Sequence, residues 1–254
     1  MNLQNPLISI IMPAYNAEKT ISQAITSVIK QSYSDWELIV VNDCSTDRTD
    51  EIIQSFASAD TRIHLLENIN NQGASLTRHK GVVASRGDWI AFLDSDDAWR
   101  EDKLEKQIAL QKKTKASLLF TGSAFMDNDG NPIDYYLKAP ERLTYHDLLK
   151  QNLLSNSSSM VKAELCKKYE SIGDQMHEDY ATWLKIMKTG IDAYGVDEPL
   201  LIYRLSSGSK SSNKIKAAKM NWNTYRYVGI SFIKSIYYMG CYTINGLKKY
   251  RNLK

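Results

Sequence analysis

Three carboxylates within four positions are the most chemically suggestive feature of this sequence. Asp94, Asp96 and Asp97 directly follow the apolar run Trp89–Leu93, with Ser95 between the first two. A buried strand that ends in acidic residues delivers them to the carboxyl edge of a sheet. Like charges this close favour a bound cation, and hard oxygen ligands suit Mg²⁺ or Mn²⁺, usually shared with a substrate's phosphates. The alternative is a polar loop whose carboxylates cap the following helix.

Two earlier apolar runs of strand length also end in polar residues. Leu7–Met12 is closed by Pro13, and Trp36–Val41 is followed by Asn42 and Asp43. Helical spacing of apolar residues follows each run, and strands that alternate with helices indicate right-handed crossovers and a mainly parallel sheet. Ligands bind beyond the carboxyl ends of such strands, so we expect the three strand ends to converge. The sequence has neither a GxGxxG after a strand nor a Walker phosphate loop.

The rest of the sequence predicts further strands and helices, which at first alternate strictly along the chain. Ser45, Thr46 and Asp47 are good caps for the helix after the second strand. The other predicted strands are His64–Glu67 and Leu118–Met126, and the predicted helices are Ala74–Ser85, Lys103–Lys115, Met160–Lys168 and Tyr180–Lys188. Glu178 and Asp179 stand at the entrance of the last of these helices.

Length and composition predict one α/β domain with a large core and a small appendage. The chain has 254 residues, of which 43% are hydrophobic, enough for such a core. Its three cysteines show no CxxC spacing, which argues against a zinc site or disulfide framework and for a reducing compartment, with the cytosol as the default. We find no secretory signal at the start and no good membrane span.

The charge is distributed unevenly along the chain. No acidic residue follows Glu198, whereas 11 of the 32 basic residues do, which leaves 21 basic against 29 acidic side chains in the first part. An acidic body with a basic, aromatic tail points to an anionic partner for the tail.

Six motifs in register resemble family 2 glycosyltransferases of the GT-A fold, from about Leu7 to about Ser212. They are PAYN at 13–16, VNDCSTD at 41–47, NxG with a later Arg at 71–78, GDWIAFLDSDD at 87–97, ED at 178–179, and YR at 203–204 before a Ser-rich loop. The resemblance implies an α/β GT-A fold for nucleotide-diphospho-sugar transfer, with a mainly parallel central sheet flanked by helices. It divides the chain into a catalytic domain over 1–212, with its nucleotide-sugar half at about 1–115 and its acceptor half at about 116–212, and a helical C-terminal extension over 213–254.

The resemblance also implies roles for single residues. Asp43 matches the residue that contacts the uracil of a UDP-sugar, with a helix N-cap as the alternative, and Arg78 matches a basic residue near the diphosphate. Asp96 and Asp94 match the DxD pair, Asp96 as the better metal ligand and Asp94 nearer the ribose. The other implied nucleotide-sugar contacts are Pro13, Ala14, Tyr15 and Asn16 along the nucleotide, Ser95, Asp97 at the sugar's edge, and Arg204.

Glu178 and Asp179 resemble the acceptor-side pair in which the Asp is the catalytic base, and ordinary capping of their helix is the alternative. Two positions depart from the family pattern. Many relatives have His where this chain has Ser206, and Asp where it has Asn42. A hydroxyl can bond a phosphate oxygen but supplies no charge.

The implied activity is an inverting, metal-dependent transfer of glucose or galactose from a UDP-sugar, with Mn²⁺ or Mg²⁺ as cofactor. The implied acceptor is a lipid-linked sugar such as GlcNAc-diphosphoundecaprenol, joined by a β-linkage such as β-1,3 in bacterial O-antigen or capsule synthesis. An aspartyl-phosphate phosphotransferase would place its DxD after the first strand, and a nucleotidylyltransferase would have a Gly-rich basic loop in place of PAYN. A non-catalytic sugar-binding module is the remaining alternative.

The pattern of the C-terminal tail indicates how the protein reaches its lipid-linked substrate. Apolar and aromatic residues from Trp222 to Gly240 recur at spacings of three and four, which is typical of an amphipathic helix at a membrane surface. We therefore expect a peripheral protein on the cytoplasmic face of the inner membrane. A helix packed on the domain or on a second subunit, as a homodimer, is the alternative. We expect no nucleic-acid partner.

Overall fold

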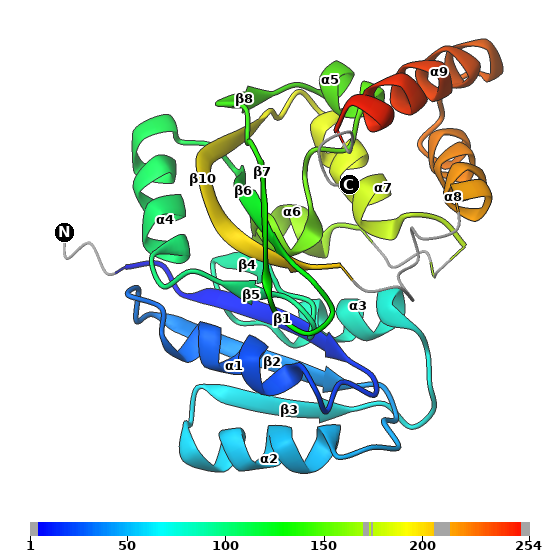
Figure 1. Cartoon of the computed structure of the whole chain (residues 1–254). Helices are drawn as coiled ribbons and strands as arrows, with labels where there is room; N and C mark the ends of the chain where they lie inside the picture. Colours follow the sequence, from blue (N-terminus) through cyan, green and yellow to red (C-terminus); the bar gives the residue numbers. More distant parts are fainter. Residues whose placement is uncertain (1–4, 170–172, 174, 206–213, 250–254) are drawn as a thin grey trace.

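The computed structural model describes residues 5–169, 173, 175–205 and 214–249. Within these ranges the strands form one sheet in the order β3-β2-β1-β4-β9-β6-β10-β5, and β7 and β8 pair with β6 and β10 (Figure 1). The strands are β1 (Ile8–Ala14), β2 (Trp36–Asn42), β3 (Ile63–Glu67), β4 (Trp89–Phe92), β5 (Ala98–Trp99), β6 (Leu118–Met126), β7 (Pro132–Leu137), β8 (Arg142–Leu143), β9 (Met160–Lys162) and β10 (Ala193–Arg204). The helices are α1 (Ile21–Ile29), α2 (Thr49–Ala59), α3 (Ala74–Ala84), α4 (Lys103–Thr114), α5 (Tyr145–Lys150), the 3₁₀ turn η1 (Asn156–Ser158), α6 (Ala163–Lys167), α7 (Glu178–Met187), α8 (Lys214–Tyr227) and α9 (Phe232–Lys249).

The first half of the sheet is parallel, as the alternating pattern predicts. β1 pairs with β2 on one side and with β4 on the other, and all residues of these three strands are buried. β1 runs through Pro13 to Ala14, two residues beyond the predicted end at Met12. The last β4 pair joins Ile11 to Phe92, so Pro13 lies beyond the β4 ladder, where its missing N–H costs the sheet little.

Helices cover both faces of the sheet and build a core on each. On one face Ile25 of α1, Ile53 of α2 and Leu104 of α4 join alternate residues of β1 and β2. On the other face Val82 of α3 and Trp183 of α7 join the remaining ones. The sheet is therefore buried on both sides, which is why its strands read as continuous apolar runs rather than alternating ones.

The prediction of one helix over Met160–Lys168 is wrong in its first part. Residues Met160–Lys162 form strand β9, and only Ala163–Lys167 are helical. β9 runs antiparallel between β4 and β6 and pairs Met160 with both Ala91 and Leu119. Three residues are too few to show a strand periodicity, so the pairing across the sheet decides the conformation.

The tail forms two helices rather than the one predicted. Gly229 has a positive φ of 82°, a conformation that favours glycine and ends helices, and it separates α8 from α9. α8 packs on α7, and α9 packs on α5 and α8. None of the described helices is both long and apolar enough to cross a membrane.

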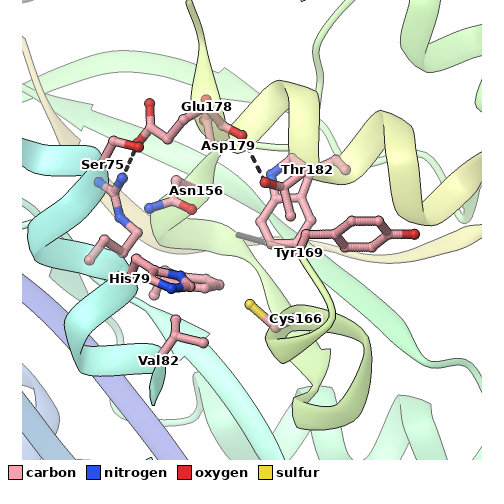
Figure 2. Close-up of a pocket in the computed structure, with 12 residues that line it drawn as sticks. Ser75, His79, Val82, Asn156, Cys166, Tyr169, Glu178, Asp179 and Thr182 are labelled. Atoms are coloured by element: carbon pink, nitrogen blue, oxygen red, sulfur yellow. Dashed lines mark hydrogen bonds and ion pairs between the residues drawn. The ribbon is translucent and has the colours of Figure 1, made fainter. Parts of the chain in front are cut away.

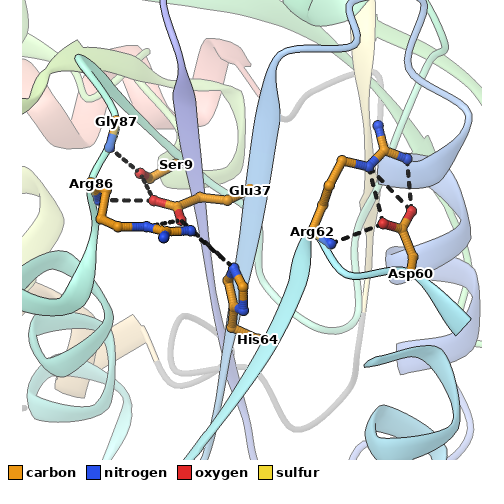
Figure 3. A network of polar contacts seen from close by, with 7 residues as sticks. All are labelled: Ser9, Glu37, Asp60, Arg62, His64, Arg86 and Gly87. Carbon is orange, nitrogen blue, oxygen red and sulfur yellow. Dashed lines mark hydrogen bonds and ion pairs between the residues drawn. The ribbon is translucent and has the colours of Figure 1, made fainter. Parts of the chain in front are cut away.

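A polar network holds the amino ends of the central strands (Figure 3). The buried Glu37 carboxylate of β2 accepts hydrogen bonds from the Ser9 hydroxyl of β1 at 2.6 Å and from the backbone and guanidinium of Arg86 before β4. Burial opposes ionisation, but these donors outweigh it and lower the pKa of Glu37. The network joins three strands at the edge of the sheet opposite to the carboxyl ends.

Candidate active site

The three polar strand ends converge, as predicted. β1, β2 and β4 are parallel neighbours, and the chain reverses its direction across the sheet between β1 and β4, the switch point at which α/β sheets bind ligands. A cleft of about 680 Å³ lies there, within the size range of small-molecule sites. Its walls include every predicted site residue except Arg204, namely Pro13, Ala14, Tyr15, Asn16, Asp43, Arg78, Asp94, Ser95, Asp96, Asp97, Glu178 and Asp179.

The loops after β1 and β2 are bonded to each other. The backbone N–H of Asn16 donates to Ser45 Oγ at 3.0 Å, and Asn16 Oδ1 accepts from the backbone N–H of Thr46 at 2.8 Å. Asn16 adopts a φ of 47°, which its side chain tolerates better than most. Asp47 also accepts from the Glu18 N–H. Ser45 and Thr46 thus fix the PAYN loop. Asp47 also accepts from the backbone N–H of Thr49, the first residue of α2, at 3.0 Å, as expected of a residue at the start of this helix, although the N-cap position itself is Arg48.

Asp43 organises the start of α3 instead of capping α2. Its buried carboxylate accepts from the backbone N–H groups of Gln72 and Gly73, both at 2.8 Å, and from Asn68 Nδ2 at 2.7 Å. Gly73 precedes α3 with a φ of 81°. A carboxylate has about four acceptor positions, so this arrangement leaves one for a ligand in the cleft that the residue lines.

The acidic loop after β4 carries more negative charge than its surroundings balance. Burial, followed by the charge of Asp94, raises the pKa of Asp96 to about 6. Asp97 is 2% exposed, and burial followed by its two acidic neighbours raises the pKa of Asp97 well above its usual value. The arrangement favours either protons or a cation at this loop.

Arg204, which the resemblance implies as a nucleotide-sugar contact, packs against this loop and is not among the residues that line the cleft. Its guanidinium donates to the backbone oxygens of Asp96 and Asn128 and to Gln23 Oε1, and its backbone N–H donates to Asp97 Oδ1. The residue is 5% exposed. These acceptors occupy most of its donors, so Arg204 positions the loop. Ser206 lies outside the described residues.

Arg78 connects the two acidic motifs across the cleft. Its guanidinium donates to Asp94 Oδ1 at 2.8 Å and also to Glu178 Oε1. Burial opposes its charge, but Asp94 and Glu178 outweigh burial and raise the pKa of Arg78. The guanidinium therefore stays charged and ties α3, the β4 loop and α7 together.

Asp179 is a partly buried carboxyl in the first turn of α7. Burial, followed by the charge of Glu178, raises its pKa to about 6, although His177 and Arg78 oppose the shift. A carboxyl with a pKa near the working pH is suited to proton transfer. The N-cap position of α7 is His177, whose side chain makes no capping bond.

The carboxylate oxygens of Asp94 and Asp96 are suitable ligands for a divalent cation that also binds a substrate. Asp94 and Asp96 present oxygens to the cleft, and their mutual repulsion would be relieved by a positive ion. In the described part of the chain no group of three or more His, Cys, Asp or Glu residues is arranged to hold a metal. Mg²⁺ is commonly bound by one or two carboxylates, with phosphates and water completing its shell, so the residues present fit a metal shared with a diphosphate.

Sequence reasoning did not predict several of the residues that line the cleft, and three of them come from the acceptor side or the tail. Asn156 lies in the turn before β9, His177 precedes the acidic pair, and Met220 comes from α8. His177 directly precedes the Glu178–Asp179 motif, so its place at the cleft could have been predicted from the sequence. Asn156 and Met220 carry no local signal, because the packing of distant elements brings them to the cleft.

The comparison with protein families identifies the family of this chain. Residues 9–167 match the family described as "Glycosyl transferase family 2". The chain therefore belongs to this family and is a glycosyltransferase. It is 41% identical over 96% of its length to a Bacillus subtilis (strain 168) protein named as a teichuronic acid biosynthesis glycosyltransferase, TuaG, of which 97% is covered. It is 38% identical, over 96% of its length and 95% of the relative, to the Escherichia coli UDP-Glc:alpha-D-GlcNAc-diphosphoundecaprenol beta-1,3-glucosyltransferase WfgD.

Solved structures confirm the GT-A fold. The S. aureus TarS fragment 1–349 in complex with UDP-GlcNAc superposes with a TM-score of 0.71 at 21% identity, over 87% of this chain and 65% of that one. This chain thus spans somewhat less than two thirds of the TarS fragment. The Pyrobaculum calidifontis mannosyltransferase PcManGT in complex with GDP-Man and Mn²⁺ gives a TM-score of 0.71 at 17% identity, over 89% of this chain and 64% of the PcManGT chain. This neighbour was thus solved with a nucleotide-sugar and a divalent metal together.

Proposed function

We propose that the protein is an inverting hexosyltransferase that moves glucose or galactose from a UDP-sugar to a lipid-diphosphate-linked sugar in the synthesis of a bacterial surface polysaccharide. The observation that carries the proposal is that one cleft joins Asp43, the Asp94–Asp97 loop and Asp179. The name of the WfgD relative supports UDP-glucose as donor, GlcNAc-diphosphoundecaprenol as acceptor and a β-1,3 linkage. Glucose and galactose differ only in the configuration of one hydroxyl, and both remain in the proposal as possible donor sugars.

In the proposed mechanism, residues of the chain position the donor and accept one proton. Asp43 and the PAYN loop hold the uridine, while Arg78 stands between the diphosphate side at Asp94 and the acceptor side at Glu178. A Mn²⁺ or Mg²⁺ ion held by Asp96 and Asp94 would act as a Lewis acid that stabilises the charge on the departing diphosphate. Arg204 keeps the acidic loop in place from beneath.

Asp179 acts as the base in this proposal. Its carboxylate takes the proton from an acceptor hydroxyl as the oxygen attacks the anomeric carbon from the face opposite UDP. Direct displacement inverts the configuration, so an α-linked donor gives a β-glycoside. A cleft with only a binding role would not need a carboxyl of raised pKa, such as Asp179, on the acceptor side.

The experiment that tests this proposal is a transfer assay with defined substrates. UDP-glucose and UDP-galactose are each offered to a synthetic GlcNAc-diphosphate-lipid in the presence of Mn²⁺. We expect one donor to be used and NMR of the product to show a β-linkage. Tight UDP binding without turnover would favour a non-catalytic module, activity only on water-soluble acceptors would contradict the lipid part, and an α-linked product would contradict the inverting mechanism.

The outer face of α9 supports a position at the membrane surface. Ile233, Ile236, Gly240, Ile244 and Leu247 recur at spacings of three and four on this face and are all exposed, Ile233 by 80% and Leu247 by 68%. The opposite face, with Ser235, Tyr238, Met239 and Tyr242, packs on the rest of the domain.

The charge of the tail favours an anionic lipid surface as the partner of this face. No acidic residue follows Glu198, and Lys234 is exposed beside the apolar row. A helix with one apolar face and flanking cations binds in the headgroup layer of anionic membranes. Met220 of α8 lines the cleft, and α8 packs on α9, so a membrane at α9 would lie on the side of the molecule from which a lipid-linked acceptor arrives. The proposed location is the cytoplasmic face of the inner membrane.

A further inference from the structure

The 3₁₀ turn η1 fixes the acidic loop Asp94–Asp97 from inside the protein. The hydroxyl of Ser157 in η1 accepts a hydrogen bond from the backbone N–H of Asp94 at 3.1 Å, across 63 positions of the chain. The same hydroxyl donates to the Asp97 carboxyl, which opposes the rise in the pKa of Asp97. Ser157 is 1% exposed, so it acts on the loop rather than on a ligand in the cleft.

The η1 turn also reaches the acceptor side of the cleft. Its first residue, Asn156, lines the cleft together with Glu178 and Asp179. Figure 2 shows the Asn156 side chain between α3, which carries His79, and the first turn of α7. A displacement of η1 would therefore disturb the acidic loop and the acceptor side of the cleft together.

Two buried side chains hold η1 from the side away from the cleft. The indole N–H of Trp99 donates to the Ser157 carbonyl oxygen at 2.7 Å, and the side-chain amide of Gln107 donates to the Ser158 carbonyl oxygen at 3.1 Å. Trp99 belongs to β5 and Gln107 to α4, and both are buried. A buried network whose members are paired holds a segment in one position, so β5 and α4 together determine where η1 lies.

Lys103, the first residue of α4, joins these two side chains. Its Nζ donates to Gln107 Oε1 at 2.8 Å and lies 3.9 Å from the centroid of the Trp99 ring. Lys103 is fully buried, and burial lowers its pKa well below the ordinary value of a lysine. The face of the Trp99 ring and the Gln107 oxygen favour its charged form, so the ammonium group holds both side chains in their places.

The burial of Lys103 indicates a role beyond packing. A buried ammonium group that has no carboxylate partner destabilises a fold, and among the described residues no carboxylate pairs with this one. A methionine would fill a similar space without that penalty, but it could neither bond to Gln107 nor attract the face of Trp99. Local destabilisation of this kind is found mainly at sites that need it.

We propose that Ser157 and Lys103 are positioning residues for the acidic loop. Ser157 sets the backbone of the loop at Asp94, and Lys103 holds Ser157 in place through Trp99 and Gln107. Both residues are buried away from the cleft, so they act on the loop and not on the substrate. The inference rests on the proposed function, in which this loop binds a divalent metal together with the diphosphate.

Amide hydrogen exchange of the protein without ligands tests the position of the loop directly. Ser157→Ala removes the acceptor of the Asp94 N–H, so exchange of this amide, measured by NMR, should be about tenfold faster than in the wild type. Lys103→Met should accelerate it to a smaller degree. Ser158→Ala is the matched control, because Ser158 is also fully buried and stands next in the turn, but its hydroxyl donates to the Ser155 carbonyl oxygen. Exchange in this control should equal that of the wild type.

Binding of UDP with and without Mn²⁺ tests the consequence for the site. Affinity for UDP in the presence of Mn²⁺ should fall about tenfold in Ser157→Ala and by a smaller factor in Lys103→Met, while affinity for uridine should be unchanged in both. The free energy of unfolding of Lys103→Met should equal or exceed that of the wild type, because the variant removes a buried charge. A residue with only a structural role would give lower stability and unchanged Mn²⁺-dependent binding, which would overturn the inference.

The double variant Lys103→Met/Ser157→Ala tests whether the two residues act in one chain of contacts. If Lys103 acts through Ser157, the double variant should lose no more Mn²⁺-dependent affinity than Ser157→Ala alone. Additive losses, or wild-type exchange of the Asp94 amide in both single variants, would overturn the inference. Failure of the proposed function looks different, because UDP binding to the wild type would then be independent of Mn²⁺, whereas the exchange rates would still show whether Ser157 and Lys103 position the loop.

Discussion

Asp179 and Glu178 are adjacent in sequence but have different surroundings, which allows their roles to be separated. Glu178 is paired with Arg78, whereas the pKa of Asp179 is raised to about 6. Asp179→Asn keeps the size of the side chain but cannot take a proton. We expect UDP-sugar affinity to stay near that of the wild type and turnover to fall by about 10²–10⁴-fold, measured by calorimetry and by UDP release.

Glu178→Gln is the control for this variant. It should weaken the contact with Arg78 and reduce turnover less than Asp179→Asn. The larger loss of turnover at unchanged donor affinity identifies the base. Wild-type turnover in both variants would show that the acceptor proton leaves by another route.

The raised pKa of Asp179 predicts how the rate depends on pH. A base must be deprotonated to act, so kcat/KM should reach a plateau about one pH unit above the pKa and fall as the pH drops through about 6. An ordinary exposed Asp would move this fall to about pH 4. A pH–rate profile with saturating metal distinguishes the two, provided that circular dichroism shows the protein to be folded at each pH.

Asp96 should control metal-dependent binding. Asp96→Ala removes an anionic oxygen ligand that water replaces poorly, so Mn²⁺-dependent binding of UDP should be lost while metal-independent binding of uridine persists at the Asp43 end of the cleft. Titration calorimetry with and without Mn²⁺ measures both. Full activity of the wild type in excess chelator would contradict a role for the metal.

Most single site residues could be predicted from the sequence because they follow parallel strands, whose carboxyl ends share one edge. Asp43, Asp94 and Asp96 were located in this way. The partners of Arg204 could not be predicted, since Gln23 lies 181 positions away in the chain and the turn that supplies the Asn128 carbonyl approaches only through β6 and β10. Asn156 was missed for the same reason.

At the level of elements, long periodic segments were predictable and short or broken ones were not. α1 and β2 follow their patterns closely. β9 has three residues, and its strand conformation depends on β4 and β6. The sequence shows a glycine at position 229, but a glycine within a helical pattern is tolerated and does not by itself end a helix. Its positive φ, and with it the break between α8 and α9, could therefore not be predicted.

The Glu37 network predicts a pH-dependent contribution to stability at the edge of the sheet away from the cleft. Glu37→Gln keeps the shape but loses the charged bonds to Ser9 and Arg86, which should lower the free energy of unfolding by about 1–3 kcal/mol at pH 7. The folded pKa of Glu37 is lowered, so its contribution is present above the unfolded pKa of about 4.3 and is lost as the pH falls through the folded value.

Urea unfolding of wild type and variant at pH 7 and at lower pH values measures this difference. The gap between the two proteins should shrink as the medium becomes acidic, and UDP affinity at pH 7 should be unchanged, because the network is remote from the site. A gap of constant size over this pH range would mean that shape rather than charge explains the contribution of Glu37.

At the scale of the whole molecule, the exposed apolar face of α9 leads to a prediction of how the enzyme is oriented toward its lipid-linked acceptor. Replacing Ile233 and Ile244 by Asn removes two exposed apolar side chains from its outer face without touching the core. Each contributes about 1 kcal/mol or more when it enters an apolar layer, so affinity for anionic vesicles should fall at least about tenfold. Co-sedimentation with vesicles of phosphatidylglycerol and phosphatidylcholine measures this, and Val83→Asn on α3 is the matched exposed control.

The same double variant separates recruitment from chemistry. Transfer to a short acceptor in detergent should proceed at the wild-type rate, whereas transfer to the acceptor embedded in vesicles should fall with vesicle affinity. Binding of the wild type should also weaken as salt rises, since the flanking cations are screened over about 8–10 Å at physiological ionic strength. If the wild type ignores anionic vesicles at low salt and sediments as a dimer that the double variant dissociates, the outer face of α9 binds a second copy of the chain and the membrane proposal is wrong.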